Sequence, residues 1–263
     1  LNAPVVLAAI TLVVFAWVIA SRAPLQLDSA TGTTTIAGNR FYGSGNTEFT
    51  LMAVCFVILA AWSGSALFAA VLGLALAVID GFPTMGADFG GPPAILFVTV
   101  LLSTWLRGKK VRLRHLLLAV VAAFAGTALF AVIDYLQAPQ ARTHLGRFVA
   151  TVIEGGAWPI VQRKAHAAWL TVAGSAGTLV AACLFVIAIG CIAVVLYSPR
   201  FSTRVSAYHR NVLLSATILL VIASLSNDSG MLILTIGLLL VGVLICGGLF
   251  RMALTLPARK TSF

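Results

Sequence analysis

The chain has 263 residues, of which 60% are hydrophobic and only 9% are charged. Soluble domains average about 25% charged residues, so this composition excludes an ordinary soluble protein, a disordered chain, a coiled coil and a disulfide scaffold. The formal net charge of +10 would suggest nucleic-acid binding in a soluble protein. The positions of the charges favour a polytopic membrane protein instead.

Apolar runs follow one another along the whole chain. A transmembrane helix needs about 20 apolar residues to cross roughly 30 Å of hydrocarbon. The stretch 47–80 is too long for one helix, and Gly64 and Ser65 near its middle are typical of a turn, so we divide it there. The predicted fold class is therefore all-α, a single transmembrane domain over 1–263 with about eight spans. The predicted helices are 3–20, 47–62, 65–80, 92–106, 115–134, 170–197, 211–225 and 231–250.

Charge predicts the orientation of these helices. Basic residues collect on the cytoplasmic side of short connections, and the densest basic cluster lies at 107–114. Placing that cluster inside the cell puts the basic connection 200–210 and the C-terminus inside, and all seven acidic residues outside. We therefore expect a multi-pass protein of the plasma membrane. The basic clusters are interpreted as topology signals and contacts with anionic membrane lipids, not as a nucleic-acid site.

Four segments rich in glycine and polar residues fall on the extracytoplasmic side under this topology, namely 38–46, 86–93, 142–148 and 227–230. Helices that begin on this side point the positive ends of their dipoles outward, and arginine suits phosphate through paired hydrogen bonds. We therefore expect one anion-binding site there. The candidate substrate-binding residues are Arg40, Tyr42, Asn46, Asp88, Arg142, His144, Arg147 and Asp228.

Simpler interpretations exist for several polar residues of this side. Asn46 and Glu48 are also the cap and first-turn acid expected where a helix begins. The segment 81–91 is expected either to re-enter the membrane as a loop or to form a surface turn. Asp80 and Asp134 each end an Ala-Val-Ile-Asp sequence at the outer end of a helix. We expect both carboxylates to reach water there, because burial in the bilayer is costly.

The longest segment predicted outside the membrane is 135–169, an extracytoplasmic interfacial segment. Its apolar residues recur at helical spacing and form one face: Leu145, Phe148, Val149, Val152 and Ile153. This pattern predicts an amphipathic helix, capped by Thr143 and ended by 155–156, that lies on the membrane or over the bundle. The helix either simply connects two spans or forms a lid that presents His144 and Arg147 to a lipid headgroup.

Acidic residues on the same side also admit a catalytic interpretation. Asp88 or Glu48 would act as a general base or as a ligand of a divalent cation, and His144 would donate or accept a proton. Asp88, Glu48 and His144 are therefore the candidate catalytic residues. We find no Ser or Cys nucleophile motif and no His-Glu-x-x-His motif, which weighs against this interpretation.

In chain order, the segments G-N-R-F-Y-G-S-G-N, G-A-D-F-G-G, R-T-H-L-G-R-F and N-D-S-G resemble those of a group of polytopic membrane proteins of actinobacteria and other Gram-positive bacteria. The resemblance covers roughly residues 40–230. It implies a cell envelope rich in polyprenyl-linked glycans, and it implies no activity. Members of the group extend further at the N-terminus, and this chain begins at Leu1, so we expect a preceding region.

Three functions stay open at this point. The first is a carrier or flippase for an anionic lipid or a polyprenyl-phosphate-linked glycan intermediate, which the one-sided polar segments and the amphipathic helix favour. The second is an extracytoplasmic transferase or hydrolase that acts on such a lipid. The third is a non-catalytic membrane subunit that anchors a partner protein. Membrane lipids are partners in all three, and nucleic acid in none.

Overall fold

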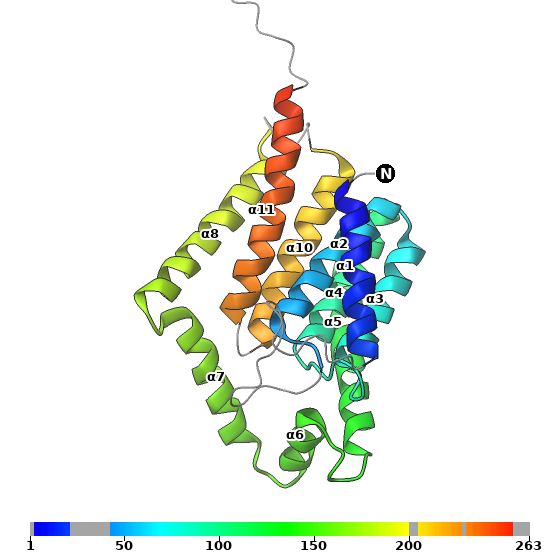
Figure 1. The fold of residues 1–263 in the computed structure, drawn as a ribbon, viewed down its shortest axis with the longest axis vertical. Coiled ribbons are helices and arrows are strands. Elements are labelled where there is room, and N and C mark those ends of the chain that lie inside the picture. The colour runs from blue at the N-terminus through cyan, green and yellow to red at the C-terminus, as the bar shows by residue number, and fades with distance from the viewer. Residues whose placement is uncertain (1–2, 22–42, 200–204, 228–229, 255–263) are drawn as a thin grey trace, which may run out of the picture.

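The structure is a computed structural model that describes residues 3–21, 43–199, 205–227 and 230–254. These residues form ten α-helices and no strand, which confirms the all-α class (Figure 1). The helices are α1 (Ala3–Ala20), α2 (Asn46–Ser63), α3 (Ala66–Gly81), α4 (Gly91–Leu106), α5 (Leu113–Tyr135), α6 (His144–Ile153), α7 (Ala157–Ala173), α8 (Ala176–Tyr197), α10 (Ala207–Ser226) and α11 (Gly230–Leu254).

Helix α2 lies at the centre of the bundle. It packs against α1, α3, α4, α10 and α11, and α4 in turn packs against α3, α5 and α10. A helix that is apolar on every side needs neighbouring helices or lipid to cover its faces. Accordingly, Phe49, Met52 and Phe56 of α2 are fully buried. Helices α7 and α8 form a V beside this bundle (Figure 1).

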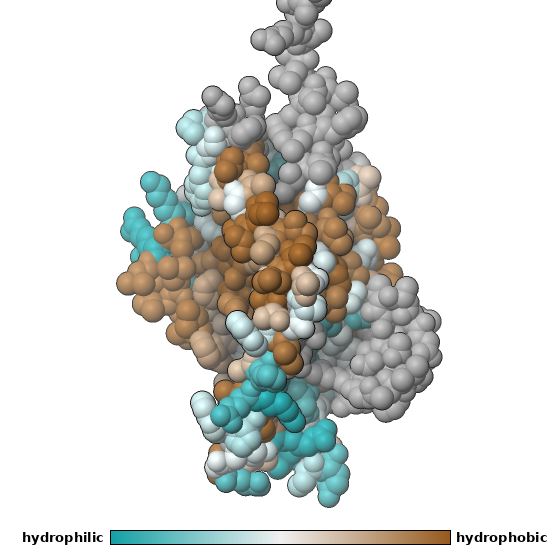
Figure 2. Space-filling view, turned by 90° about the vertical axis from the view of Figure 1, so that its left-hand side faces the viewer, coloured by the Kyte–Doolittle hydropathy of each residue, from teal (hydrophilic) through white to brown (hydrophobic). Residues whose placement is uncertain are grey.

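The outward faces of the bundle are apolar. Val13 of α1 is 67% exposed and Phe124 of α5 is 75% exposed, and Figure 2 shows a broad hydrophobic band with hydrophilic residues gathered below it. Contiguous apolar surface of this size is rare on soluble proteins. Within the part of the chain that the structure describes, four helices, α1, α2, α5 and α10, are long and apolar enough to cross a bilayer. These features together indicate a membrane protein.

The division of 47–80 into two helices is confirmed. Gly64 ends α2 with φ +63°, a left-handed conformation that favours glycine, and its N–H donates to the carbonyl oxygen of Ala61. Ser65 then caps α3, because its Oγ accepts a hydrogen bond of 3.2 Å from the N–H of Phe68. A single helix also covers each of the predicted spans 3–20, 92–106, 115–134, 211–225 and 231–250.

The region 135–197 differs in part from the prediction. The amphipathic helix is confirmed as α6, with Thr143 at its N-cap. A second helix, α7, was not predicted, and it extends beyond 169 into the expected span 170–197, which breaks at Gly174. Proline fits a first helical turn, where its missing N–H needs no partner. Pro159 thus helps to start α7 after Gly156.

Candidate functional site

The segment 82–90, between α3 and α4, is the centre of the candidate site. The chain turns back on the end of α3, because the N–H of Gly86 donates to the carbonyl oxygen of Ile79 (2.8 Å) and that of Asp88 to Asp80 (2.9 Å). A Cβ on Gly86 would overlap the carbonyl oxygen of Asp80, so only glycine fits there. The segment is folded against protein, with Pro83, Gly86 and Asp88 buried.

The other three polar segments meet 82–90 through their described residues. The N–H of Ser44 donates to the carbonyl oxygen of Gly86 (2.8 Å). The side chain of Asn227 lies against Gly90, and the Oγ of Ser226, the residue before it, donates to the carbonyl oxygen of Gly90 (2.7 Å). The ring of Phe148 on α6 lies 6.4 Å from the ring of Phe89, measured between centroids. The four segments therefore come together, as the topology predicts. We call this region, residues 43–46, 82–91, 134–148 and 226–227, the loop end.

Asp88 holds the first turn of α4. Its Oδ1 accepts a hydrogen bond from the N–H of Phe89 and its Oδ2 accepts one from Gly91, each at 2.8 Å. A carboxylate at this position satisfies helix N–H groups that have no partner within the helix, and it lies at the positive end of the helix dipole. Capping accounts for the burial of Asp88 without a ligand, and its predicted role in substrate binding or catalysis stays a prediction.

Asp134 organises the start of α6. Its Oδ1 accepts from the N–H of Thr143 (3.0 Å), and its Oδ2 accepts from the Thr143 hydroxyl and from the N–H of Gly146, both at 2.5 Å. The carboxylate is fully buried. Our expectation that it reaches water is wrong, because the next helix begins directly over it and supplies hydrogen-bond donors in place of water.

Asp80 is the counterpart of Asp134 at the end of α3. It is also fully buried, so the expectation that it reaches water is wrong here too. Its carboxylate lies against Gly91 in the first turn of α4, where a Cβ would overlap Oδ2. The two Ala-Val-Ile-Asp sequences therefore share one structural position, an aspartate covered by the N-terminal turn of the following helix.

Glu48 lies in the first turn of α2, where its carboxylate folds back over Gly45. The N-cap is Gly45 and not Asn46, which is the first helical residue, so the predicted cap at Asn46 is wrong by one position. Glu48 is only 2% exposed, and its Oε1 accepts no hydrogen bond from the described residues. Capping explains one oxygen of this carboxylate and leaves the other open to a further role.

The basic candidates of the loop end lie around the start of α6. Arg142 is half-buried, with its Nε donating to the carbonyl oxygen of Gln137 (3.2 Å) and its guanidinium 4.3 Å above the Tyr135 ring. Arg147 is exposed, and its Nε donates to the carbonyl oxygen of Thr143 (3.2 Å). His144 is half-buried between them in the chain. Both arginines are oriented by the contact of Nε with a backbone carbonyl oxygen. Their terminal nitrogens form no hydrogen bond with the described residues.

Three candidates, Arg40, Tyr42 and Asp228, lie outside the described residues. Within the described part of the chain, no three His, Cys, Asp or Glu side chains come together as metal ligands. Sequence reasoning missed the contacts of Asp134 with Thr143 and Gly146. The sequence signal that could have indicated these contacts is the Ala-Val-Ile-Asp repeat, because each copy is followed by a residue that caps the next helix and by a glycine.

The comparisons with known proteins add no relative. The chain matches no protein-family model, no curated protein and no solved structure.

Proposed function

We propose that this is a multi-pass protein of the plasma membrane that binds an anionic lipid, or a lipid-linked intermediate of the polyprenyl-phosphate type, at the loop end and translocates it. In this proposal the loop end faces the outside of the cell and about eight helices cross the bilayer. Helices α3 and α4 have 16 residues each. They rise about 24 Å, so the buried segment 82–90 would lie within the outer membrane interface.

One observation carries the proposal: the acidic side chains of the loop end accept hydrogen bonds from backbone N–H groups of the protein, whereas its arginines form no ion pair with them. Asp88 and Asp134 accept hydrogen bonds from backbone N–H groups. Among the described residues, neither Arg142 nor Arg147 forms an ion pair. Two guanidinium groups, that of Arg142 just before α6 and that of Arg147 on it, are therefore available to a phosphate, which arginine binds through its planar fork.

Helix α6 also gives this site an apolar side, as a lipid ligand requires. Leu145 anchors the helix in a small cluster with Phe130 and Ala131. At its other end, Val152 is 43% exposed and Ile153 is 64% exposed. An interfacial helix of this kind binds a lipid headgroup through its basic residues while its apolar residues contact acyl chains.

Binding of a short-chain polyprenyl phosphate to the full chain in phosphatidylcholine nanodiscs, followed by native mass spectrometry, tests the proposal. We expect the double variant Arg142→Ala/Arg147→Ala to bind at least about tenfold more weakly, since each charge-assisted contact contributes about 1.5–3 kcal/mol. Arg163→Ala/Lys164→Ala is the matched control, because it removes the same charge from exposed positions on α7. Equal affinity of the two double variants would contradict the proposal.

An enzyme that acts on the same lipid is the second candidate, and Glu48 favours it. The other acidic candidate, Asp88, has both carboxylate oxygens bound by backbone N–H groups. Glu48 combines near-complete burial with an oxygen that accepts no hydrogen bond from the described residues. A buried carboxylate of this kind is typical of a general base or acid.

A further inference from the structure

The opposite end of the bundle gathers basic side chains from two connections that are distant in sequence. Helix α4 runs from the loop end to the connection 107–112, which lies beside the first turns of α5 and α10. A shallow hollow of about 470 Å³ opens between them, lined by Trp105, Lys109, Lys110, Arg210, Asn211 and Leu214 among others. We call this surface, together with Arg112, Arg114 and His115 next to it, the basic end.

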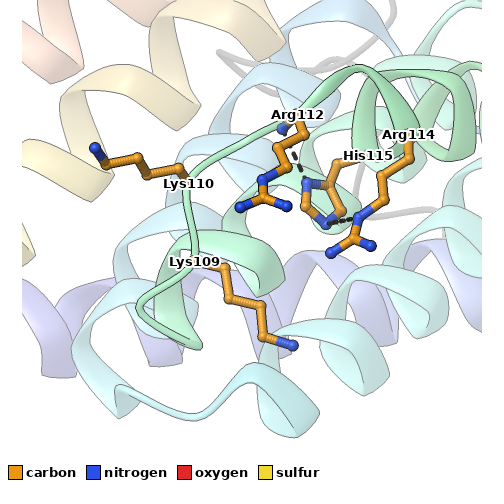
Figure 3. Close-up of a pocket in the computed structure, with 5 residues that line it drawn as sticks. All are labelled: Lys109, Lys110, Arg112, Arg114 and His115. Carbon is orange, nitrogen blue, oxygen red and sulfur yellow. Dashed lines mark hydrogen bonds between the residues drawn. The ribbon is translucent and has the colours of Figure 1, made fainter.

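Figure 3 shows the adjoining hollow of about 280 Å³, which is lined by basic side chains alone. The N–H of Arg112 donates to Nδ1 of His115 (3.0 Å), while Nε of Arg114 approaches Nε2 of the same ring at 3.3 Å. A neutral imidazole has only one acceptor nitrogen, so it satisfies only one of these two donors. Hydrogen-bond donors therefore outnumber acceptors around His115, and a bound anion would supply the acceptors that are missing.

Among the described residues, the charge of the basic end has no acidic counterpart. The seven acidic residues are Asp28, Glu48, Asp80, Asp88, Asp134, Glu154 and Asp228, and none lies on the connection 107–112 or in the first turn of α5 or α10. Acids normally occupy first turns, because the helix dipole is positive there. Arg114 and Arg210 occupy them instead, so a bound anion would relieve a repulsion between basic side chains that the described acidic residues do not compensate.

The hollow also has an apolar wall. Trp105 and Leu214 line it beside the lysines, and Leu113 and Leu117 of the adjacent α5 are 70% and 56% exposed. A free phosphate would use only the basic side of this surface. A ligand with an anionic head and acyl chains would use both, and tryptophan is common at this level of a membrane protein.

We propose that the basic end is a binding site for the headgroup of an anionic phospholipid such as phosphatidylglycerol. Lys109, Lys110 and Arg210 contact the phosphate across the hollow, and the acyl chains lie along the exposed face of α5. The lipid joins the α4–α5 connection to α10. This site is separate from the loop end, so it acts whether or not the loop end binds a translocated lipid.

The test measures phosphatidylglycerol bound by the full chain in detergent, using native mass spectrometry. We expect Lys109→Ala/Lys110→Ala/Arg210→Ala to lower the affinity on the order of 100-fold at low salt, because each basic residue near an anionic headgroup contributes about fivefold. Lys109→Arg/Lys110→Arg keeps the charge and is expected to bind within about threefold of the parent. The same loss in Arg163→Ala/Lys164→Ala, or no loss in the triple variant, would overturn the proposal.

Two further measurements keep the test independent of folding and of the loop end. Binding to the unmodified protein is expected to weaken as salt is raised, because the contacts are ionic and exposed, and insensitivity to salt would overturn the proposal. Inorganic phosphate is expected to compete poorly, and competition as strong as that of the lipid would show a free-phosphate site instead. Lys109→Ala/Lys110→Ala/Arg210→Ala is expected to keep the affinity of the loop end for a short-chain polyprenyl phosphate, so failure of either proposal can be told from failure of the other.

Discussion

Replacing Asp134 by alanine is expected to detach α6 from the bundle and to destabilise the protein by about 3–5 kcal/mol. Three of the hydrogen bonds that the carboxylate accepts come from the start of α6, two from the backbone N–H groups of Thr143 and Gly146 and one from the Thr143 hydroxyl. Alanine would leave these three buried donors without an acceptor, and a buried donor left unsatisfied costs about 1–3 kcal/mol. Because α6 also carries Arg147, the same variant is expected to weaken lipid binding.

Hydrogen exchange of the backbone amides of α6 measures this effect directly, together with the thermal unfolding of the detergent-solubilised protein. Gln137→Ala is the matched control, since its amide reaches the same Oδ1 only at 3.4 Å from a partly buried position, and we expect a change within about 0.5 kcal/mol. Protection of α6 that is the same in Asp134→Ala as in the parent protein would show that the carboxylate does not hold this helix.

Gly86→Ala is expected to destabilise the loop end by about 3 kcal/mol. The added methyl group would overlap the carbonyl oxygen of Asp80, which is backbone and cannot rotate away. The carbonyl of Gly86 also accepts the hydrogen bond from Ser44, so displacement of this residue would separate two of the four segments. Thermal unfolding and hydrogen exchange of 82–90 follow the change.

Gly190→Ala on α8 is the control for this variant. No atom lies within 4 Å of the position that its Cβ would take, and alanine has a higher helix propensity than glycine by about 1 kcal/mol. We therefore expect Gly190→Ala to be neutral or mildly stabilising. Equal melting temperatures for the two variants would contradict the close packing of Gly86 on α3.

All of the described helices except α7, and the convergence of the polar segments, were predictable, because they depend on patterns that are local in sequence. The turn at Gly64 follows from a glycine and a serine between two apolar runs. The meeting of Ser44, Phe148 and Ser226 around 82–90 follows from counting helices, since each apolar run reverses the direction of the chain. Neither inference needs side-chain geometry.

The roles of the acidic residues were not predictable in the same way. Asp134 is buried by donors nine and twelve residues further along, and whether they reach it depends on the fold of the connection. The wrong expectation for Asp80 and Asp134 came from treating a carboxylate at a helix end as facing water, although a following helix N-terminus satisfies it equally well. The helix α7 was missed because the glycines before it and the proline in its first turn are also typical of loops.

Movement of a fluorescent polyprenyl phosphate across the bilayer of proteoliposomes tests the proposed function most directly. Liposomes with the parent protein are expected to move the lipid between leaflets faster than empty liposomes, and Arg142→Ala/Arg147→Ala is expected to lose that increase while Arg163→Ala/Lys164→Ala retains it. Release of a product from the lipid would favour the enzymatic alternative. A rate equal to that of empty liposomes, with no product formed, would contradict the proposal that the loop end serves lipid translocation.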